Sequence, residues 1–370
     1  MKLLHLSDLH IGRKLKGFPL IEDQKHILNE IFNIAKKEEV NGVIISGDIY
    51  DTSIPNTEAI NLFDKFISDM NNEGIACYIV SGNHDNVYRV SFGSSIMAKE
   101  NIHFAKRYSG ELQPIKADKN TCIWLLPFIR PADVREFHND FTTSNYEEMM
   151  KTVLKNIDLD EKKVNILVAH QFITANGVAP ERSESETVFL GTLDNIDYSV
   201  FDKFDYVALG HIHKPQSMGR KTVRYAGSPL KYSFSEVDHK KSACLIEINK
   251  KEVSYTKIPL TPLRDMKEFK GSFEEMMKLR SDDYVHVTLT DDFIPDVKSR
   301  LETVFPYLMQ IDYDNARTRN ESQLEAFDTQ AEKSLSENFE EFYFAQNQTE
   351  LNDNQKKIIE EILEEMEGAL

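Results

Sequence analysis

Six short apolar runs that end in polar residues constrain this chain more than any other feature. They are rich in Val, Ile and Leu, which is typical of strands buried on both faces. Helical patterns separate several of them, and alternation of strands and helices predicts a layered α/β fold. The runs cover residues 2–10, 42–51, 75–85, 121–128, 164–172 and 206–213.

Side chains suited to binding metal ions stand at the C-terminal ends of five of these runs. In an α/β sheet the carboxyl ends of the strands meet at one rim, where ligands bind. Residues i and i+2 of an extended chain also point to the same side. We therefore expect these side chains to converge on one site. They are, in chain order, Asp8, His10, Asp48, Asn83, His84, His170, His211 and His213.

The chemistry of these side chains favours two ions rather than one. Carboxylate, amide and imidazole donors without sulfur suit Mn²⁺, Fe²⁺ or Zn²⁺ better than Ca²⁺. The set is larger than one such ion needs, so we expect two ions that share the carboxylate of Asp48. Two neighbouring ions activate a water molecule and bind a phosphoryl oxygen. Each motif alone is common in turns, and only their joint occurrence favours the metal site.

Charge excludes binding of nucleic acid through a general basic surface. The net charge is −17, and residues 321–370, with 14 acidic and 3 basic residues, carry −11 of it. The other 320 residues carry only −6, so the acidity belongs mainly to the tail, and a general basic surface for nucleic acid is not expected. A nucleic-acid site would therefore be local, and bound metal would supply its positive charge.

Three regions follow from the patterns along the chain. A core is predicted over 1–262, and its residues 222–262 are expected to form hairpins that finish a sheet. Residues 261–269 are interpreted as a linker, and 266–315 as a small α+β unit with helices near 273–280 and 295–304. Residues 321–370 are polar with helical apolar spacing.

One helix is predicted over 56–74, with Asn56 as its cap. Four of its residues are expected on one packed face: Ile60, Phe63, Ile67 and Met70.

No membrane span is predicted, because no apolar run approaches about 20 residues. No signal peptide is predicted either, because the first apolar run, "LLHLSDLH", contains a charged residue and histidines. A cytoplasmic protein that does not contact membranes is therefore expected. Cys77, Cys122 and Cys244 lie far apart in apolar stretches, which predicts buried thiols rather than a zinc–thiolate site.

Five motifs resemble those of the calcineurin-like metallophosphoesterase superfamily. They are "DLH" (8–10), "GDIYD" (47–51), "GNHD" (82–85), His170 and "GHIH" (210–213). The resemblance implies a sandwich of two sheets flanked by helices. It also implies that Asp8, His10, Asp48 and His213 hold one metal, and that Asp48, Asn83, His170 and His211 hold the other. His84 would protonate the leaving oxygen after a metal-bridging hydroxide attacks the phosphorus.

Several longer stretches resemble the bacterial SbcD nucleases, among them "MKLLHLSDLHIGRKL", "GNHDNVYRVSFG" and "RYAGSPLKYSFSE". This resemblance implies a DNA exonuclease and endonuclease with two Mn²⁺ ions, for which Mg²⁺, Fe²⁺ or Zn²⁺ are alternatives. It implies a homodimer, with the helices near 56–70 and 87–100 as the candidate interface. It further implies that 266–315 caps the DNA and that 321–370 docks on an SbcC-type ATPase.

The sequence leaves two interpretations open for the roles of four residues. Asp51 either orients His84 as part of the catalytic site or caps the following turn. Arg13, Arg89 and Lys214 are expected to contact DNA phosphates, and the alternative is that they are solvated basic residues.

Two rival functions also stay open. One is a phosphatase or cyclic-nucleotide phosphodiesterase with the same metals, although the unit at 266–315 and the acidic tail at 321–370 are of little use to such an enzyme. The other is a non-catalytic scaffold of DNA repair, against which the intact set of ligands argues.

Overall fold

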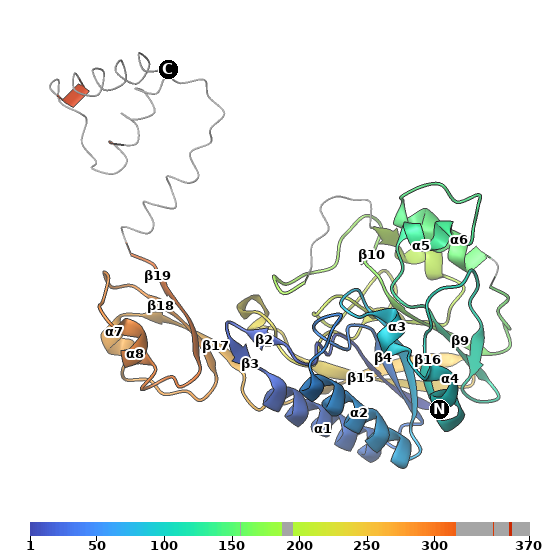
Figure 1. The fold of residues 1–370 in the computed structure, drawn as a ribbon, viewed down its shortest axis with the longest axis horizontal. Helices are drawn as coiled ribbons and strands as arrows, with labels where there is room; N and C mark the ends of the chain where they lie inside the picture. Colours follow the sequence, from blue (N-terminus) through green and yellow to red (C-terminus); the bar gives the residue numbers. More distant parts are fainter. Residues whose placement is uncertain (156, 187–194, 316–342, 344–354, 357–370) are drawn as a thin grey trace. The chain divides into compact units, whose positions relative to one another are not determined.

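The computed structural model describes residues 1–155, 157–186, 195–315, 343 and 355–356. The chain divides into two compact units, Met1–Lys267 and the residues from Glu268 onward (Figure 1). The segment predicted over 321–370 to dock on an ATPase lies outside the described residues, except for three positions.

Two six-stranded sheets form the first unit. The first has the order β16 (Glu252–Pro259), β15 (Ser242–Asn249), β1 (Lys2–Leu6), β4 (Gly42–Ser46), β5 (Ala76–Val80) and β6 (Ile102–Phe104). The second has the order β13 (Gln216–Ser217), β14 (Val223–Tyr225), β12 (Tyr206–Gly210), β9 (Val164–His170), β8 (Thr121–Leu125) and β7 (Pro114–Lys116). Strands β1, β4, β5 and β6 are parallel, as are β8, β9, β12 and β14. The predicted layered α/β class is confirmed.

The two sheets pack face to face through apolar side chains. Ile44 and Val80 of the first sheet share one buried cluster with Ile166, Val168 and Ala208 of the second. All five are fully buried, so the central strands lie between two apolar layers, as the runs of Val, Ile and Leu predict. This packing brings the C-terminal ends of strands from both sheets to one place.

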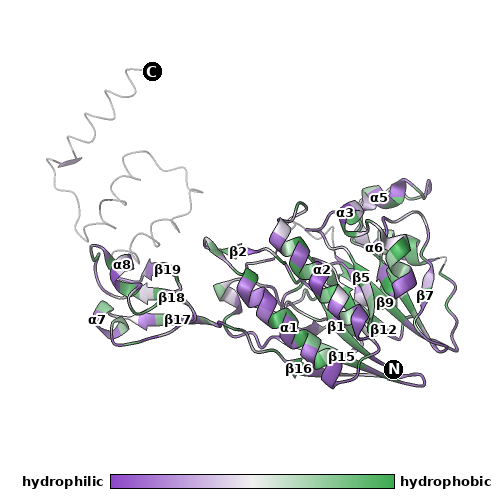
Figure 2. Ribbon diagram, turned by 60° about the horizontal axis from the view of Figure 1, so that its bottom comes forward, coloured by the Kyte–Doolittle hydropathy of each residue, from purple (hydrophilic) through white to green (hydrophobic). Residues whose placement is uncertain are grey.

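Helices cover the outer faces of both sheets. α1 (Ile21–Lys37) and α2 (Thr57–Asn72) lie side by side, and α2 packs on β5 (Figure 2). The side chain of Asn56 caps α2 by accepting a hydrogen bond from the Ala59 amide at 2.8 Å, as predicted. On the second sheet, Met150 and Leu154 of α6 (Tyr146–Lys155) pack with residues of β9 and β12.

Shorter elements connect these layers. They are β2 (Lys14–Leu15), β3 (Phe18–Pro19), α3 (Val87–Val90), α4 (Ser94–Met97), η1 (Ala98–Glu100), α5 (Pro131–Arg135), β10 (Ile173–Thr174), β11 (Ile196–Asp197), η2 (Tyr198–Phe201) and η3 (Phe234–Glu236).

Three expectations from the sequence are wrong. Ile60 is expected on the packed face of its helix, but 45% of it is exposed, because the contact surface of α2 is narrower than its apolar stripe. The strands between 222 and 262 do not form one run of hairpins, since β14 joins the second sheet while β15 and β16 pair in the first. Residues 266–269, the end of the segment interpreted as a linker, belong to a strand, Met266–Gly271, in which three polar side chains are exposed: Lys267, Glu268 and Lys270.

The second unit contains a three-stranded sheet with two short helices. Its strands have the order β17 (Met266–Gly271), β18 (Tyr284–Leu289) and β19 (Leu308–Tyr313), and β18 and β19 are parallel. α7 (Phe273–Met276) and α8 (Val297–Leu301) are shorter than the helices predicted there. Met276, Val287 and Phe305 belong to its own buried core.

Two smaller expectations concern the cysteines and membrane-spanning helices. Cys77, Cys122 and Cys244 are buried free thiols, as predicted. Within the described ranges no helix combines the length and the apolar character that crossing a bilayer requires.

Candidate metal centre

The predicted ligands meet where the C-terminal ends of five strands converge. β1, β4 and β5 come from the first sheet, and β9 and β12 from the second. Three groups of side chains have ligand atoms within 4.8 Å of one another, and these groups share members. They are Asp8, His10 and His213; His10, Asp48 and His84; and Asp8, Asp48 and His170.

Asn83 and His211 join the centre through direct contacts. The Asn83 Oδ1 atom lies 3.0 Å from His170 Nε2 and 2.9 Å from His211 Nδ1. The main-chain amide of His211 donates to both carboxylate oxygens of Asp8, at 3.0 and 3.2 Å. All seven residues expected to bind metal are therefore in one cluster.

Hydrogen bonds behind His170 determine which of its nitrogens faces the centre. Its Nδ1 atom lies 2.7 Å from the main-chain oxygen of Ser46. A carbonyl can only accept, so Nδ1 carries a proton and Nε2 is the nitrogen that faces the centre. Burial lowers the pKa of His170, but Asp48 raises it to about 9, and a metal ion at Nε2 would displace this second proton. Nε2 lies 3.3 Å from Asp48 Oδ2. This is the arrangement that a metal-binding histidine requires.

The electrostatics of the cluster fit cations. Asp8 and Asp48 are almost fully buried, and buried carboxylates need compensating positive charge. Burial alone would raise the pKa of Asp48, but His170 and His10 hold it well below its usual range. Burial and the charge of His170 lower the pKa of His211 to about 3. His211 is thus a neutral donor of a lone pair.

The short distances between the donor atoms of the cluster also fit bound metal ions. The Nε2 atoms of His10 and His213 are 3.2 Å apart, and His10 Nε2 lies 3.7 Å from Asp48 Oδ2. A bound cation gives such converging lone pairs a common partner. The donor set of oxygen and nitrogen atoms therefore fits the two ions that were expected, with Asp48 between the two groups of histidines.

Strained backbone accompanies these contacts. Asp8, His10 and Asp48 have φ values of 51°, 43° and 50°, and His211 has 104°. Non-glycine residues are uncommon in this region, and clusters of them are typical of functional sites. Gly210 keeps the space behind the centre clear, since a Cβ atom there would lie 1.9 Å from the Ser46 oxygen.

His84 lies at the edge of the cluster and is only partly buried. Its Nδ1 atom is 2.9 Å from the main-chain oxygen of Asp51, and its ring packs edge-on against His10 at 4.8 Å between centroids. The carboxylate of Asp51 lies 3.1 Å from Arg13 Nη1 and 3.6 Å from His10 Nδ1. Asp51 therefore contacts His84 through its carbonyl group, which any residue at this position would supply.

The three basic residues expected to contact DNA have different surroundings. Arg13 is paired with Asp51 beside the centre, and its guanidinium lies 5.1 Å from the ring centroid of Tyr232. Lys214 forms an ion pair with Glu181. Arg89 is exposed on α3.

Two supporting residues were not singled out from the sequence. Asp85 accepts hydrogen bonds from the amides of Ile49, Tyr50 and Gly82 and so joins the loops after β4 and β5. Gln24 of α1 donates to the oxygen of His10 at 2.7 Å. A signal existed for Gln24, because it lies on the apolar face of α1 with Ile27, Leu28 and Ile31.

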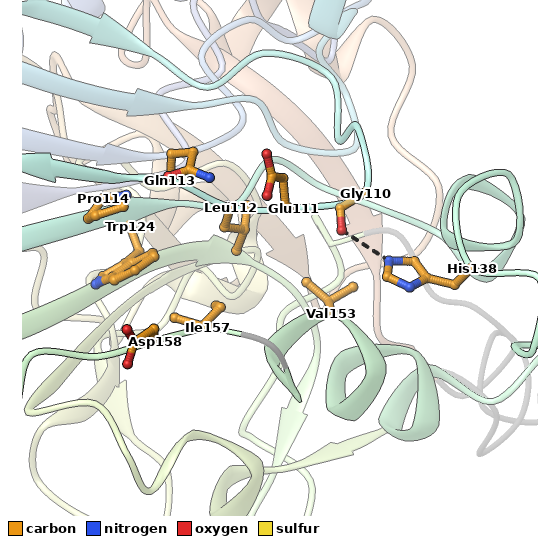
Figure 3. A pocket seen from close by; sticks show the side chains of 10 residues that line it. All are labelled: Gly110, Glu111, Leu112, Gln113, Pro114, Trp124, His138, Val153, Ile157 and Asp158. Atoms are coloured by element: carbon orange, nitrogen blue, oxygen red, sulfur yellow. Dashed lines mark hydrogen bonds between the residues drawn. The ribbon is translucent and has the colours of Figure 1, made fainter.

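A cavity of about 430 Å³ lies elsewhere in the first unit, between the β7–β8 edge and α6. Figure 3 shows Trp124, Glu111 and His138 around it, with His138 bonded to the Gly110 oxygen. None of the predicted ligands lines this cavity. It is therefore separate from the candidate metal centre.

Comparisons with known proteins agree with the geometry. Residues 1–215 match the model of the calcineurin-like phosphoesterase family. Residues 262–347 match the family described as type 5 capsule protein repressor C-terminal domain. A dimetal phosphatase from Danio rerio aligns with 71% of this chain and 98% of its own, at 10% identity and a TM-score of 0.41, a likeness too low to carry an argument.

Two curated relatives are each named as the SbcD component of the nuclease SbcCD. The Staphylococcus epidermidis protein is 33% identical over 84% of this chain and 85% of its own. The protein from Staphylococcus saprophyticus subsp. saprophyticus is 30% identical over 98% of both chains. This chain therefore belongs to the calcineurin-like phosphoesterase family and, within it, to the SbcD proteins of the SbcCD nucleases.

Proposed function

We propose that this protein is a metal-dependent DNA nuclease that acts as the nuclease subunit of a complex with an SbcC-type ATPase. One observation carries the proposal: seven nitrogen and oxygen donors from five strands converge on a buried centre at the junction of two sheets. The names of the relatives point to the same activity.

The residues that would hold the two ions form two groups around Asp48. Asp8, His10 and His213 would bind one ion, and Asn83, His170 and His211 the other, with the Asp48 carboxylate shared between them. When bound, two such ions, for which we propose Mn²⁺, supply a nucleophile at neutral pH and neutralise charge on the phosphoryl group.

His84 is positioned to donate a proton to the leaving oxygen. The Asp51 oxygen holds its Nδ1 atom at 2.9 Å, so that a second proton on Nε2 can pass to an alkoxide. A sugar alkoxide is a poor leaving group unless it is protonated, and imidazole titrates near neutral pH. General acid catalysis of this kind contributes about 10²–10⁴-fold to a rate.

Two segments outside the metal-binding motifs, residues 266–315 and 321–370, favour DNA over a small substrate. We propose double-strand exonuclease and single-strand or hairpin endonuclease action, with the unit around 266–315 against the DNA and 321–370 as the ATPase-docking segment. Arg13 beside the centre and Arg89 on α3 would contact phosphates.

The test compares two substrates for one purified, full-length protein. Linear and hairpin DNA, and p-nitrophenyl phosphate, are incubated with MnCl₂, with and without EDTA. We expect DNA cleavage that EDTA abolishes, and we expect Asp48→Asn to remove it. Rapid turnover of p-nitrophenyl phosphate without DNA cleavage would favour a phosphatase. Repair in cells by an inactive variant would favour a scaffold.

A homodimer is also proposed, through the surface of α2, α3 and α4. An apolar groove of about 260 Å³ lies there, lined by Phe63 and Ile67 among others. Phe92, which also lines this groove, is 83% exposed, and Ile96 of α4 is 73% exposed. Exposed apolar surface of this kind marks protein contacts.

A further inference from the structure

His213 is held from three sides by residues that the proposed mechanism does not use. Its main-chain amide donates to Glu186 Oε1 at 2.7 Å, and its main-chain oxygen accepts from Lys241 Nζ at 3.0 Å. Its ring nitrogen Nδ1 lies 2.7 Å from the hydroxyl oxygen of Ser185 and 3.3 Å from Glu236 Oε1. The hydroxyl group of Ser185 in turn donates to Glu236.

A buried ion pair completes this arrangement. Glu236 Oε2 lies 2.5 Å from Lys241 Nζ, and neither residue is appreciably exposed. An ammonium group this close to a carboxylate favours the ionised form of the carboxylate. The carboxylate is therefore ionised and can only accept hydrogen bonds.

Ionised Glu236 determines which atoms of Ser185 and His213 donate hydrogen bonds and which accept them. Because Glu236 accepts, the hydroxyl of Ser185 must donate to it, and Ser185 must then accept from Nδ1 of His213. His213 Nδ1 thus carries the proton. Nε2 is left with a lone pair that faces His10 Nε2 at 3.2 Å. Partners of this kind set the tautomer and orientation of metal-binding histidines.

We propose that Glu236, Lys241 and Ser185 together are positioning residues that prepare His213 to bind metal. The inference rests on the proposed metal centre. It goes beyond that proposal because it assigns a role in metal affinity to three residues outside the ligand motifs. A purely structural ion pair would support the fold but leave the affinity for metal unchanged.

The main test removes both charges together. The variant Glu236→Met/Lys241→Met replaces the pair with apolar side chains of similar length, and such replacements of buried ion pairs are often neutral for stability. Metal-free, full-length protein is dialysed against MnCl₂, and bound Mn²⁺ is counted per chain. Urea denaturation measures stability on the same samples.

We expect the unsubstituted protein to bind two Mn²⁺ ions. In the double variant one of the two should bind about 10- to 100-fold more weakly, while the urea midpoint changes little. Equal affinity for both ions in the variant would overturn the inference. If the unsubstituted protein bound no Mn²⁺, the proposed metal centre itself would be wrong, and the inference with it.

A second variant decides the matter if the double variant does not fold. Ser185→Ala removes the linking hydroxyl without exposing a buried charge, and we expect about a tenfold loss of Mn²⁺ affinity at one site. Unchanged affinity would again overturn the proposal. The matched control is Glu184→Gln, which alters an exposed carboxylate on the same segment and should leave the binding of both ions unchanged.

Discussion

The Nδ1 atom of His170 lies 2.7 Å from the main-chain oxygen of Ser46. This contact joins the end of β9 in the second sheet to the end of β4 in the first. It sets the orientation of a metal ligand and links the two sheets at the point where the centre lies. Any side chain that separates these two groups should therefore damage both the fold and the metal centre.

The substitution Gly210→Ala should damage both the fold and the metal centre. Its Cβ atom would lie 1.9 Å from the Ser46 oxygen and 2.8 Å from His170 Nδ1, and both neighbours are fully buried. We expect a loss of about 3 kcal/mol in the free energy of unfolding, measured by urea denaturation. The control Gly17→Ala meets no atom of the described residues within 4 Å and should cost about 1 kcal/mol, from its positive φ alone. Equal losses would contradict this account.

His84→Ala should leave the metals bound but slow the chemistry. His84 has a ring nitrogen within ligand distance of His10 and Asp48, but its Nδ1 atom is held by the Asp51 oxygen, and the proposed ligand sets do not include it. We expect Mn²⁺-dependent DNA cleavage to fall about 10²–10⁴-fold, with the stoichiometry of bound Mn²⁺ unchanged. His26→Ala, at an exposed position on α1, is the control. Undiminished cleavage by the His84 variant would refute the assigned role.

Asp51→Asn should have a smaller effect than His84→Ala. The group that holds His84 Nδ1 is the main-chain oxygen of Asp51, which the substitution retains. Only the contacts of the carboxylate with Arg13 and His10 are altered. We expect a rate of DNA cleavage at least about tenfold above that of His84→Ala. Rates as low as those of the His84 variant would show that the carboxylate itself acts with His84.

Buried His5 should make the stability fall in acid. Its ring lies between Ser46 Oγ at 2.9 Å and Tyr206 Oη at 3.1 Å, and burial, together with the charge of Arg224, lowers its pKa to about 3. The unfolded chain binds the proton near pH 6.5, so between those values only the unfolded state is protonated, and stability falls as pH falls.

This effect can be isolated by comparison with His5→Gln. Lowering the pH from 7.5 to 5 should cost the unsubstituted protein about 2 kcal/mol more of its unfolding free energy than it costs the variant. Urea denaturation at the two pH values measures the difference. Parallel pH profiles for the two proteins would contradict the low pKa of His5.

The apolar surface beside α2 should hold two copies of this chain together. Phe92→Ser/Ile96→Ser removes the two most exposed apolar side chains there, and we expect the mass measured by light scattering to fall from that of a dimer to that of a monomer. Phe293→Ser, which alters a residue 78% exposed in the second unit, should leave the mass unchanged. A monomeric unsubstituted protein would disprove the dimer.

The sequence by itself determined the strands and the ligands that follow them. Runs of Val, Ile and Leu and the polar residues at their ends depend on periodicity within a few residues, which is read directly from the chain. Thus β1, β4, β5, β9 and β12 were all predicted, and Asp8 and His213, although they are far apart in the chain, were placed in one site.

Only the tertiary structure decided how the sheets divide the strands and what stands behind each ligand. β14 pairs with β12 rather than with its neighbour in sequence, β15. Likewise, the carbonyl of Asp51 rather than its carboxylate holds His84 Nδ1, and Glu236 and Lys241 lie behind His213. Contacts of this kind join residues that are distant in the chain, and they exist only after the two sheets have packed, so no local pattern records them.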